Sequence, residues 1–232
     1  MAFVPYVPPA LADDVRSLIA ADIPNSTYDF LIYHDYLSRQ APVPARALRA
    51  QLNFKSDINN ADRTTEFYAP LGTELFKGDV LYFPALEIWA QVSWTVHAQV
   101  NALNTQIMLC NARLRFERYQ DEVVDENAML LKEAGWHAVT APMPVSLSNT
   151  YMRFDYVKKS ETPGIIPSNL LEVKLQCNPA TLKLRINDQF DYGPERYKVT
   201  NIEYADTDID QRHGLLKVVG EKAAGESAHA GA

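Results

Sequence analysis

The sequence predicts a mainly β protein, built of small antiparallel barrels or a sandwich, with a short helical N-terminal segment. Two observations predict this class. From about Arg46 onward, hydrophobic residues recur with a period of two in short runs separated by turn residues, and no strand–helix–strand alternation recurs. The chain of 232 residues is long enough to bury a substantial core. We expect an N-terminal arm with helices over 1–44, β segments over 45–157 and 158–222, and a flexible tail over 223–232.

Two helices are expected in the N-terminal region. Residues 10–22 follow two prolines and carry apolar side chains at helical spacing, which predicts a short amphipathic helix. These apolar positions are Leu11, Val15, Leu18 and Ile19. A second helix is expected to begin at Ser26, whose hydroxyl suits an N-cap, to continue through Tyr36 and to end before Pro42 and Pro44.

The first β segment begins with a half-buried strand over residues 48–55, where apolar and polar residues alternate. The polar stretch 57–63 predicts an exposed loop. Further strand-like runs follow at residues 64–69, 80–83, 88–100 and 105–119. The last two are long enough to pair as a β-hairpin across residues 101–104.

The second half of the chain has the same strand-and-turn character. Residues 121–134 are acidic and then apolar, which is compatible with one helical turn or with a loop. Residues 139–157 predict a strand pair split around 146–149, and a connection rich in turn residues follows over 158–168. Four more strand-like runs lie at residues 170–176, 181–186, 196–205 and 214–219.

The two β segments share an approximate plan. Gly78-Asp79-Val80-Leu81-Tyr82 leads through a turn to the run 88–92, and Asn187-Asp188-Gln189-Phe190 leads through a turn to the run 196–202. A Cys-Asn pair occurs in both segments, but it follows the hairpin in one and precedes it in the other. Two explanations stay open: an internal duplication, or the hairpins that any antiparallel barrel contains.

The residue types that carry catalysis or bind metals are scattered. Cys110 and Cys177 are too few for a disulfide framework and lack metal-ligand spacing, so we expect two buried free thiols. The five histidines form no metal-binding pattern, and the chain has neither a G-x-S-x-G motif nor a glycine-rich phosphate loop. We therefore expect no enzyme activity, no cofactor and no metal.

Carboxylates gather in two places. Asp206, Asp208 and Asp210 resemble the start of a calcium-binding loop, but the glycine and glutamate that such a loop requires are replaced by Gln211 and Lys217. A solvated turn is the favoured interpretation. The other group includes Asp121 and Glu122, which would be the residues to consider if the chain were an enzyme with a site assembled from scattered carboxylates.

Charge and hydropathy restrict the partners. The net charge of −7 comes from charges spread along the chain, which argues against a clustered basic face for duplex DNA. The longest stretch without a charged residue, 88–112, contains several amide side chains and is unsuited to spanning a membrane. The N-terminus lacks a signal-peptide pattern, so the protein is expected to stay where it is made.

Several short stretches carry a family resemblance. They are Gly78–Leu81 with Trp89–Val92, Leu109–Phe116, and Arg196–Ile202 with Gly214–Val218. These stretches are similar to neck proteins of tailed bacteriophages, the head-closure, head-to-tail adaptor or collar proteins that ring the exit below the portal. The resemblance implies small β-barrels and a homo-oligomeric ring around the DNA channel, in contact with portal and tail proteins. It also implies a virion location after synthesis in the host cytoplasm.

The helical first 40 residues depart from a simple stopper and fit a collar, adaptor or decoration role. Extended Pro-rich segments lose little entropy on docking, and mobile polar loops suit contacts between neighbours. The expected interface residues are Pro5, Tyr6, Pro8, Asp57, Asn59, Asn60 and Arg63. An acidic channel lets DNA slide by repulsion, and the expected channel-facing residues are Asp206, Asp208 and Asp210.

A second function remains open. The chain is alternatively a β-rich binding module, such as a tail-associated domain that binds a glycan or a protein. In that case Trp89 and Trp94 would be the residues that bind a host glycan.

Overall fold

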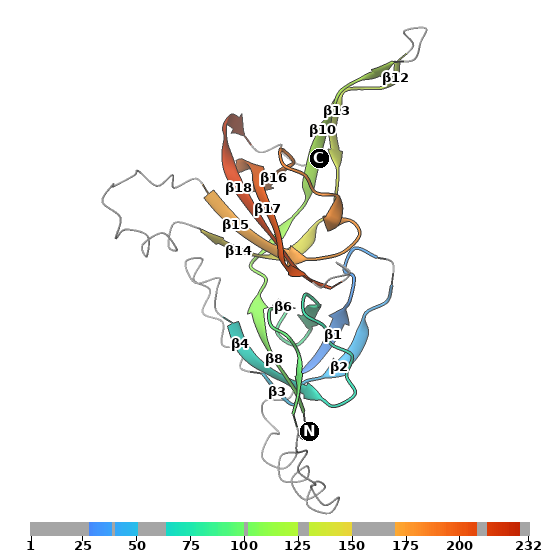
Figure 1. Cartoon of the computed structure of the whole chain (residues 1–232), viewed down its shortest axis with the longest axis vertical. Helices are drawn as coiled ribbons and strands as arrows, with labels where there is room; N and C mark the ends of the chain where they lie inside the picture. Colours follow the sequence, from blue (N-terminus) through green and yellow to red (C-terminus); the bar gives the residue numbers. More distant parts are fainter. Residues whose placement is uncertain are drawn as a thin grey trace, which may run out of the picture.

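The computed structural model describes residues 28–38, 40–50, 64–99, 102–124, 130–149, 170–207 and 213–227. These residues form two curled antiparallel β-sheets, one above the other along the long axis of the molecule (Figure 1). The expectation of a mainly β fold with barrel-like antiparallel sheets is confirmed. No helix of the described ranges has the length and apolar character needed to cross a membrane.

The first sheet has the strand order β2-β1-β5-β6-β8-β4-β3, with β7 paired to β8. Its strands are β1 (Asp29–Tyr33), β2 (Val43–Arg46), β3 (Arg49–Ala50), β4 (Thr64–Pro70), β5 (Val80–Phe83), β6 (Ile88–Val92), β7 (His97–Ala98) and β8 (Ala102–Leu109). Its core is centred on Phe30, whose ring packs edge-on against Phe67 at 5.2 Å and stacks with Phe83 at 5.6 Å. These rings alternate with outward-facing residues along their strands, so one face of the sheet is buried in the hydrophobic core.

The second sheet has the order β13-β10-β16-β17-β18-β15-β14-β9. Its strands are β9 (Ala112–Leu114), β10 (Phe116–Gln120), β13 (Gly135–Ala138), β14 (Met143–Asn149), β15 (Leu170–Gln176), β16 (Gln189–Tyr192), β17 (Glu195–Thr207) and β18 (Gly214–Ser227). β11 (Val123–Val124) and β12 (Leu130–Lys132) form a separate two-stranded sheet. In the core Phe190 contacts Phe116 at 5.2 Å and stacks with Tyr197 at 5.5 Å.

The two sheets have the same topology. If β1, β2, β3, β4, β5, β6 and β8 are matched in chain order with β10, β13, β14, β15, β16, β17 and β18, the strand order is identical in both. The matching hairpins are those in which the sequence showed a shared plan. The structure therefore supports an internal duplication. The Cys-Asn pairs do not correspond, because Cys110 follows β8 whereas Cys177 follows β15.

The turn before each matching hairpin is also the same. In each, a buried aspartate, Asp79 or Asp188, accepts the backbone N–H three residues earlier at 2.7 Å. The residue before it has positive φ, 91° at Gly78 and 79° at Asn187. The backbone N–H of this positive-φ residue donates to a carbonyl of the strand that closes the hairpin, at 2.8 Å for Gly78 and 2.9 Å for Asn187. Two independent strand pairings would not be expected to reproduce this whole set of bonds.

The helix expected from Ser26 through Tyr36 is wrong where the structure describes it. Asp29–Tyr33 form strand β1, in which Phe30 and Ile32 are buried and their neighbours are more exposed. This alternation has the period of a strand. Pro44, expected to lie beyond the helix, belongs to the edge strand β2, where a missing N–H is tolerated. The helix expected over 10–22 lies outside the described residues.

Three expectations for the second half are also wrong. The run 181–186 contains the 3₁₀ turn η3 (Thr181–Lys183), because the Asn178 side chain accepts the N–H groups of Ala180 and Thr181 at 3.0 and 2.9 Å. The split expected at 146–149 does not exist, because those residues continue β14. The segment 121–134 contains β11 and β12 where a helical turn or a loop was expected.

The long strands expected at 88–100 and 105–119 are interrupted. The first is divided into β6 and β7, and the second into β8, β9 and β10. The break after β8 occurs at Cys110 and Asn111, where the Asn111 amide donates to the Leu147 carbonyl and accepts the Leu147 N–H, both at 2.8 Å. The expected pairing of these two runs with each other is confirmed, because β6 and β7 both pair with β8.

The chain passes from one sheet to the other between β8 and β9. The expected segment 45–157 therefore contributes strands to both sheets, and its boundary does not coincide with the change of sheet. The tail expected over 223–232 is wrong up to Ser227, which pairs with Glu195 in the long ribbon of β17 and β18. Of the strand expected over 48–55, only Arg49 and Ala50 are described as strand residues.

Candidate functional site

The junction between the two sheets is fixed by one buried amide. Gln176, at the end of β15, is 1% exposed. Its Oε1 accepts the Tyr36 N–H at 2.8 Å, and its Nε2 donates to the carbonyls of Tyr33 and His34 at 2.8 and 3.0 Å. Because every bond links the second sheet to the turn after β1, Gln176 positions that turn and its side chains.

A close backbone approach forms the second link of the junction. The Gly214 N–H donates to the Lys77 carbonyl at 2.7 Å. A Cβ atom on Gly78 would lie 2.0 Å from the Gly214 carbonyl oxygen, and φ of Gly78 is 91°. A side chain at Gly78 is therefore excluded both by space and by the backbone conformation.

Four half-buried aromatic side chains gather beside this junction. They are Tyr33, Tyr36, Tyr82 and Trp89, called here the aromatic cluster. Tyr82 and Trp89 are cross-strand partners whose rings stack at 4.4 Å, and Trp89 lies 5.5 Å from each of Tyr33 and Tyr36. The guanidinium carbon of Arg113 lies 5.1 Å from the centre of the Trp89 ring. The cluster thus joins aromatic rings from β1, the turn after it, β5 and β6 with a cation from β9.

A shallow pocket of about 230 Å³ adjoins the cluster. It is lined by Trp89, Cys110, Asn111, Ala112, Arg113 and Pro144. Pockets for small-molecule ligands usually measure ~300 to 1,000 Å³, so this one is better suited to one or two side chains of a partner. Burial raises the pKa of the Cys110 thiol, which therefore stays protonated at neutral pH and is a poor nucleophile.

The cluster offers unused hydrogen-bond donors. Within the part of the chain that the structure describes, the hydroxyl groups of Tyr33, Tyr36 and Tyr82 make no hydrogen bond. Burial raises the pKa of Tyr33, and the neighbouring Tyr36 and Tyr82 raise it further, whereas Arg113 lowers it. The Tyr33 hydroxyl is therefore protonated at neutral pH and can donate to a carbonyl of a partner.

The duplicated sheet shows which of these residues the fold itself requires. Tyr33 in the first sheet and Glu117 in the second sheet occupy equivalent positions, because each pairs with the residue that follows the turn aspartate of its own sheet. By the same count Tyr82 matches Asp191, and Trp89 matches Arg196. Three aromatic positions of the first sheet are thus charged in the second. The aromatic cluster is a property of the first sheet and not of the topology.

In the second sheet these positions anchor an arm. Arg196 is 1% exposed and donates to Glu117 Oε2 at 3.1 Å and to the Gln189 amide oxygen. Its Nη1 lies 3.6 Å from Asp191, and its guanidinium carbon lies 4.3 Å from the centre of the Trp136 ring. The guanidinium therefore fastens β13, which carries Trp136, to the strands of the sheet.

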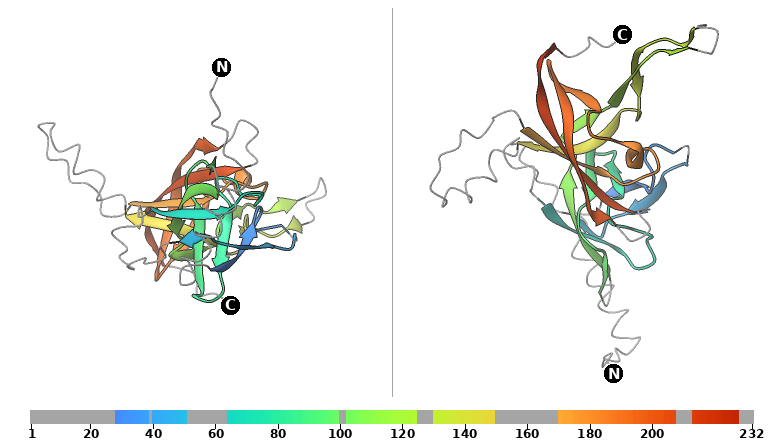
Figure 2. Two further views of the ribbon diagram at one scale, coloured as in Figure 1. Left: turned by 90° about the horizontal axis from the view of Figure 1, so that it is seen from below. Right: turned by 45° about the horizontal axis from the view of Figure 1, so that its top comes forward.

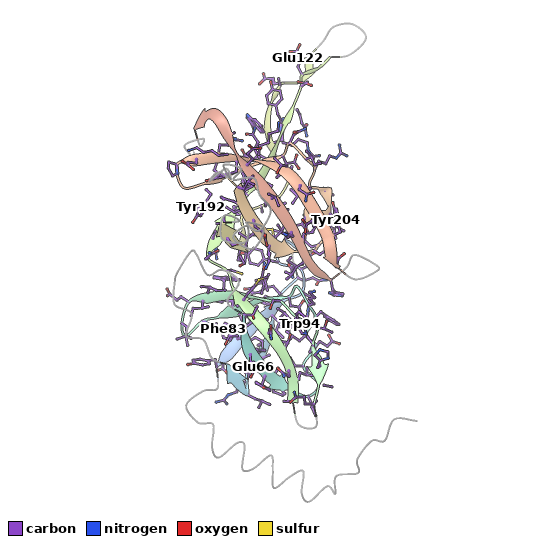
Figure 3. All side chains as sticks on the ribbon, turned by 60° about the vertical axis from the view of Figure 1, so that its left-hand side comes forward. Glu66, Phe83, Trp94, Glu122, Tyr192 and Tyr204 are labelled. Carbon is purple, nitrogen blue, oxygen red and sulfur yellow. The ribbon has the colours of Figure 1, made fainter. Side chains whose placement is uncertain are left out.

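The arm itself projects beyond the second sheet. β10 and β13 extend outward together and continue into β11 and β12, at the end remote from the first sheet (Figures 1 and 2). Figure 3 places Glu122 at the outer part of this arm. Tyr119 on the arm is 51% exposed and contacts Trp136 at 5.5 Å. The arm therefore carries an exposed aromatic side chain at Tyr119.

The turn aspartates have matching cationic partners. His34 Nδ1 lies 3.0 Å from Asp79 Oδ2, and Arg118, at the equivalent position, contacts both oxygens of Asp188 at 2.7 and 2.9 Å. The hydrogen bond to Asp79 raises the pKa of His34. Burial raises the pKa of the Asp79 carboxyl, opposed by its bonds to His34 and to the Phe76 N–H. The first turn is therefore held by a titratable cation and the second by a permanent one.

Most residues singled out from the sequence as interface or channel residues lie outside the described ranges. These are Pro5, Tyr6, Pro8, Asp57, Asn59, Asn60, Arg63, Asp208 and Asp210. Asp206 lies in β17, opposite Leu215. Asp121 and Glu122 are exposed in the outer part of the arm, between β10 and β11. Neither cysteine forms a disulfide with another described residue; Cys177 is buried and Cys110 is half-buried.

Trp89 and Trp94 do not share a site. Trp89 belongs to the aromatic cluster, whereas Trp94 is 57% exposed and has no ring contact with the cluster among the described residues. Sequence reasoning missed Tyr33 and Tyr36, which it placed in a helix, and Arg113. The short run Phe30–Tyr33, made of aromatic and branched apolar residues, was the available signal for the first of these.

Within the described ranges, no group of three or more His, Cys, Asp and Glu side chains is placed to bind a metal ion. Comparison with protein-family models gives no match for the chain. Comparisons with curated proteins and with solved structures give none either.

Proposed function

We propose that this chain is a structural virion protein of the phage head-to-tail connection, which assembles as a ring around the DNA channel. It would be made in the host cytoplasm, contact portal and tail proteins in the virion, and act without catalysis. The fold supports this proposal to the extent that curled antiparallel sheets are what the resemblance to neck proteins implies. The net charge of −7 is compatible with DNA passing without being trapped.

The arm is the observation that carries the proposal. β11 and β12 pair with each other and with no other strand of the described residues. A two-stranded ribbon is at best marginally stable in water by itself, so an arm of this kind is expected to pack on a partner. Tyr119, exposed over half of its surface, supplies apolar area for that contact. A second copy of the chain is the partner that a ring provides.

Shortening the arm tests this role. Gln120 pairs with Gly135, so replacing residues 121–134 by Asn-Gly closes β10 and β13 with a two-residue turn. We expect the wild-type chain to elute as one multi-copy species in size-exclusion chromatography with light scattering, and the shortened chain to elute as a monomer with an unchanged circular dichroism spectrum. Trp94→Ser, on an exposed side chain of the first sheet, is the control and should keep the assembly. A shortened chain that still assembles would contradict the role of the arm.

A glycan-binding module is the second candidate, because the aromatic cluster and its pocket form a surface on which a sugar ring could stack. A glycan-binding module is expected to be a monomer, whereas the proposed virion protein is expected to form a ring. A persistent monomer that binds a glycan array, and loses that binding on replacement of Trp89, favours the module.

A further inference from the structure

We propose that the aromatic cluster is the docking site for the Pro-rich N-terminal segment, residues 3–9, of a neighbouring copy of the chain. This inference rests on the proposed ring, and it names the contact by which one copy recognises the next. Three features carry it: the sequence of the segment, the chemistry of the cluster, and the contrast with the duplicated sheet.

The segment has the composition of a polyproline II ligand. Residues 3–9 are Phe-Val-Pro-Tyr-Val-Pro-Pro, in which Pro5 and Pro8 have the spacing of a P-x-x-P motif. A polyproline II helix makes no internal hydrogen bonds, so its carbonyl groups stay available as acceptors. The first charged side chain of the sequence is Asp13, which leaves residues 3–9 without a charge to desolvate.

The cluster has the groups that such a ligand requires. Polyproline II segments dock on grooves lined by aromatic rings, with donors that reach the ligand carbonyls. Tyr82 and Trp89 stack on each other, the Tyr33 ring is tilted to Trp89, and the Tyr36 ring is at about a right angle to it. These rings provide the aromatic surfaces. The tyrosine hydroxyls, which have no hydrogen-bond partner among the described residues, and the exposed Arg113 are the donors. The adjoining pocket of about 230 Å³ is of a size for one or two side chains.

The duplication shows that the topology does not require aromatic rings at these positions. The matching positions Glu117, Asp191 and Arg196 support the same topology with charged side chains. Partly exposed aromatic residues that the fold does not require are favoured as binding residues, since Trp and Tyr contribute strongly to interfaces. The second sheet uses the same face to hold its arm, whereas the first leaves it open to a partner.

The proposed ring makes a neighbouring copy the donor of the segment. β1 begins at Asp29, and the cluster residue Tyr33 lies at its other end, about 13 Å away at the ~3.3 Å per residue of a strand. The sequence between Pro9 and Asp29 has 19 residues, which are enough to span this distance, so reach alone allows either copy. A ring requires contacts between copies, and crosslinking between labelled and unlabelled copies separates the two cases.

Photo-crosslinking in the full-length chain tests the contact. Tyr6 is replaced by p-benzoylphenylalanine, and copies with this residue are mixed with ¹⁵N-labelled copies without it before assembly. We expect crosslinks from position 6 to peptides that contain Tyr33–Tyr36 or Tyr82–Trp89 of the labelled copy. Trp89→Leu, and separately the double variant Pro5→Ser with Pro8→Ser, should lower the crosslink yield by about tenfold, because a central aromatic or proline contact is lost. Trp94→Leu is the matched control and should leave the yield unchanged.

Four results would overturn the inference. They are crosslinks only within one copy, crosslinks to other surfaces, a yield that Trp89→Leu leaves unchanged, and a cluster that instead binds glycans through Trp89 while position 6 crosslinks elsewhere. If rings form and the crosslink fails, only this inference falls. If the chain stays monomeric in all samples, the proposed function falls with it.

Discussion

At the scale of single residues, the two sheets neutralise the same buried aspartate in different ways. Asp79 and Asp188 are each 1% exposed and close equivalent turns. A buried carboxylate is costly unless it is paired, and Arg118 supplies a charge that does not titrate in the physiological range. His34 loses its charge as the pH rises. The first turn is therefore the one whose stability depends on pH.

Replacing His34 by arginine should remove this dependence. The bond to Asp79 raises the pKa of His34, so the pairing stabilises the fold fully below the ordinary histidine pKa of about 6.5 and is lost as the pH rises through the raised value. We expect the free energy of unfolding of the wild type to fall over that range, and His34→Arg to flatten this fall. Urea denaturation at a series of pH values measures it. His97→Arg, on an exposed histidine, should keep the wild-type slope. An equal slope in His34→Arg would refute the assignment.

Arg196 is the residue whose loss should cost most at the base of the arm. Arg196→Met leaves Glu117 and Asp191 without their buried cation, and breaking such a group typically costs about 3 to 5 kcal/mol. Arg115→Met removes a half-exposed partner of the same Glu117, for which ~0 to 1 kcal/mol is expected. Chemical denaturation of the two variants measures the difference. Equal effects would show that burial of Arg196 does not matter.

At the scale of elements, the turn between β4 and β5 links the sheets. Gly72→Ala and Gly78→Ala separate backbone strain from contact, because both glycines have similar φ values, 88° and 91°. A Cβ at Gly72 meets nothing within 4 Å, whereas one at Gly78 meets the Gly214 carbonyl. We expect a loss of about 1 kcal/mol at Gly72 and on the order of 3 kcal/mol or more at Gly78. Thermal unfolding checks this, and similar losses would contradict the close packing of the junction.

The elements that sequence predicted well are those in which local pattern and tertiary structure agree. Alternation and turn residues identified the hairpin of β5 with β6 and that of β16 with β17. The expected strand at 181–186 failed because the Asn178 side chain stabilises a tight turn there. The break after β8 depends on bonds from Asn111 to Leu147, 36 residues away, which no local pattern contains.

The candidate site was predictable only in part. Tyr82 and Trp89 were expected in strands because they stand within alternating runs. Their approach to Tyr33 depends on the pairing of β1 with β5, and their approach to Arg113 depends on the passage of the chain into the second sheet. These contacts arise from tertiary structure. An interpretation that placed Tyr33 in a helix could not predict them.

At the scale of the whole molecule, one chain contains two sheets of the same topology with different surfaces. The first carries the aromatic cluster, and the second carries the arm at the remote end of the molecule (Figure 1). A chain with two distinct contact surfaces can join two neighbours, and repetition of such a heterologous contact closes a ring when the rotation allows it. This arrangement is the physical basis of the proposed assembly.

Native mass spectrometry of the full-length chain, combined with negative-stain imaging of the same sample, decides whether the chain assembles as a ring. We predict one dominant species whose mass is an integer multiple, of three or more, of the chain mass, seen as rings of uniform diameter with a central opening. A chain that remains monomeric across the concentration range, with no rings in the images, would contradict it.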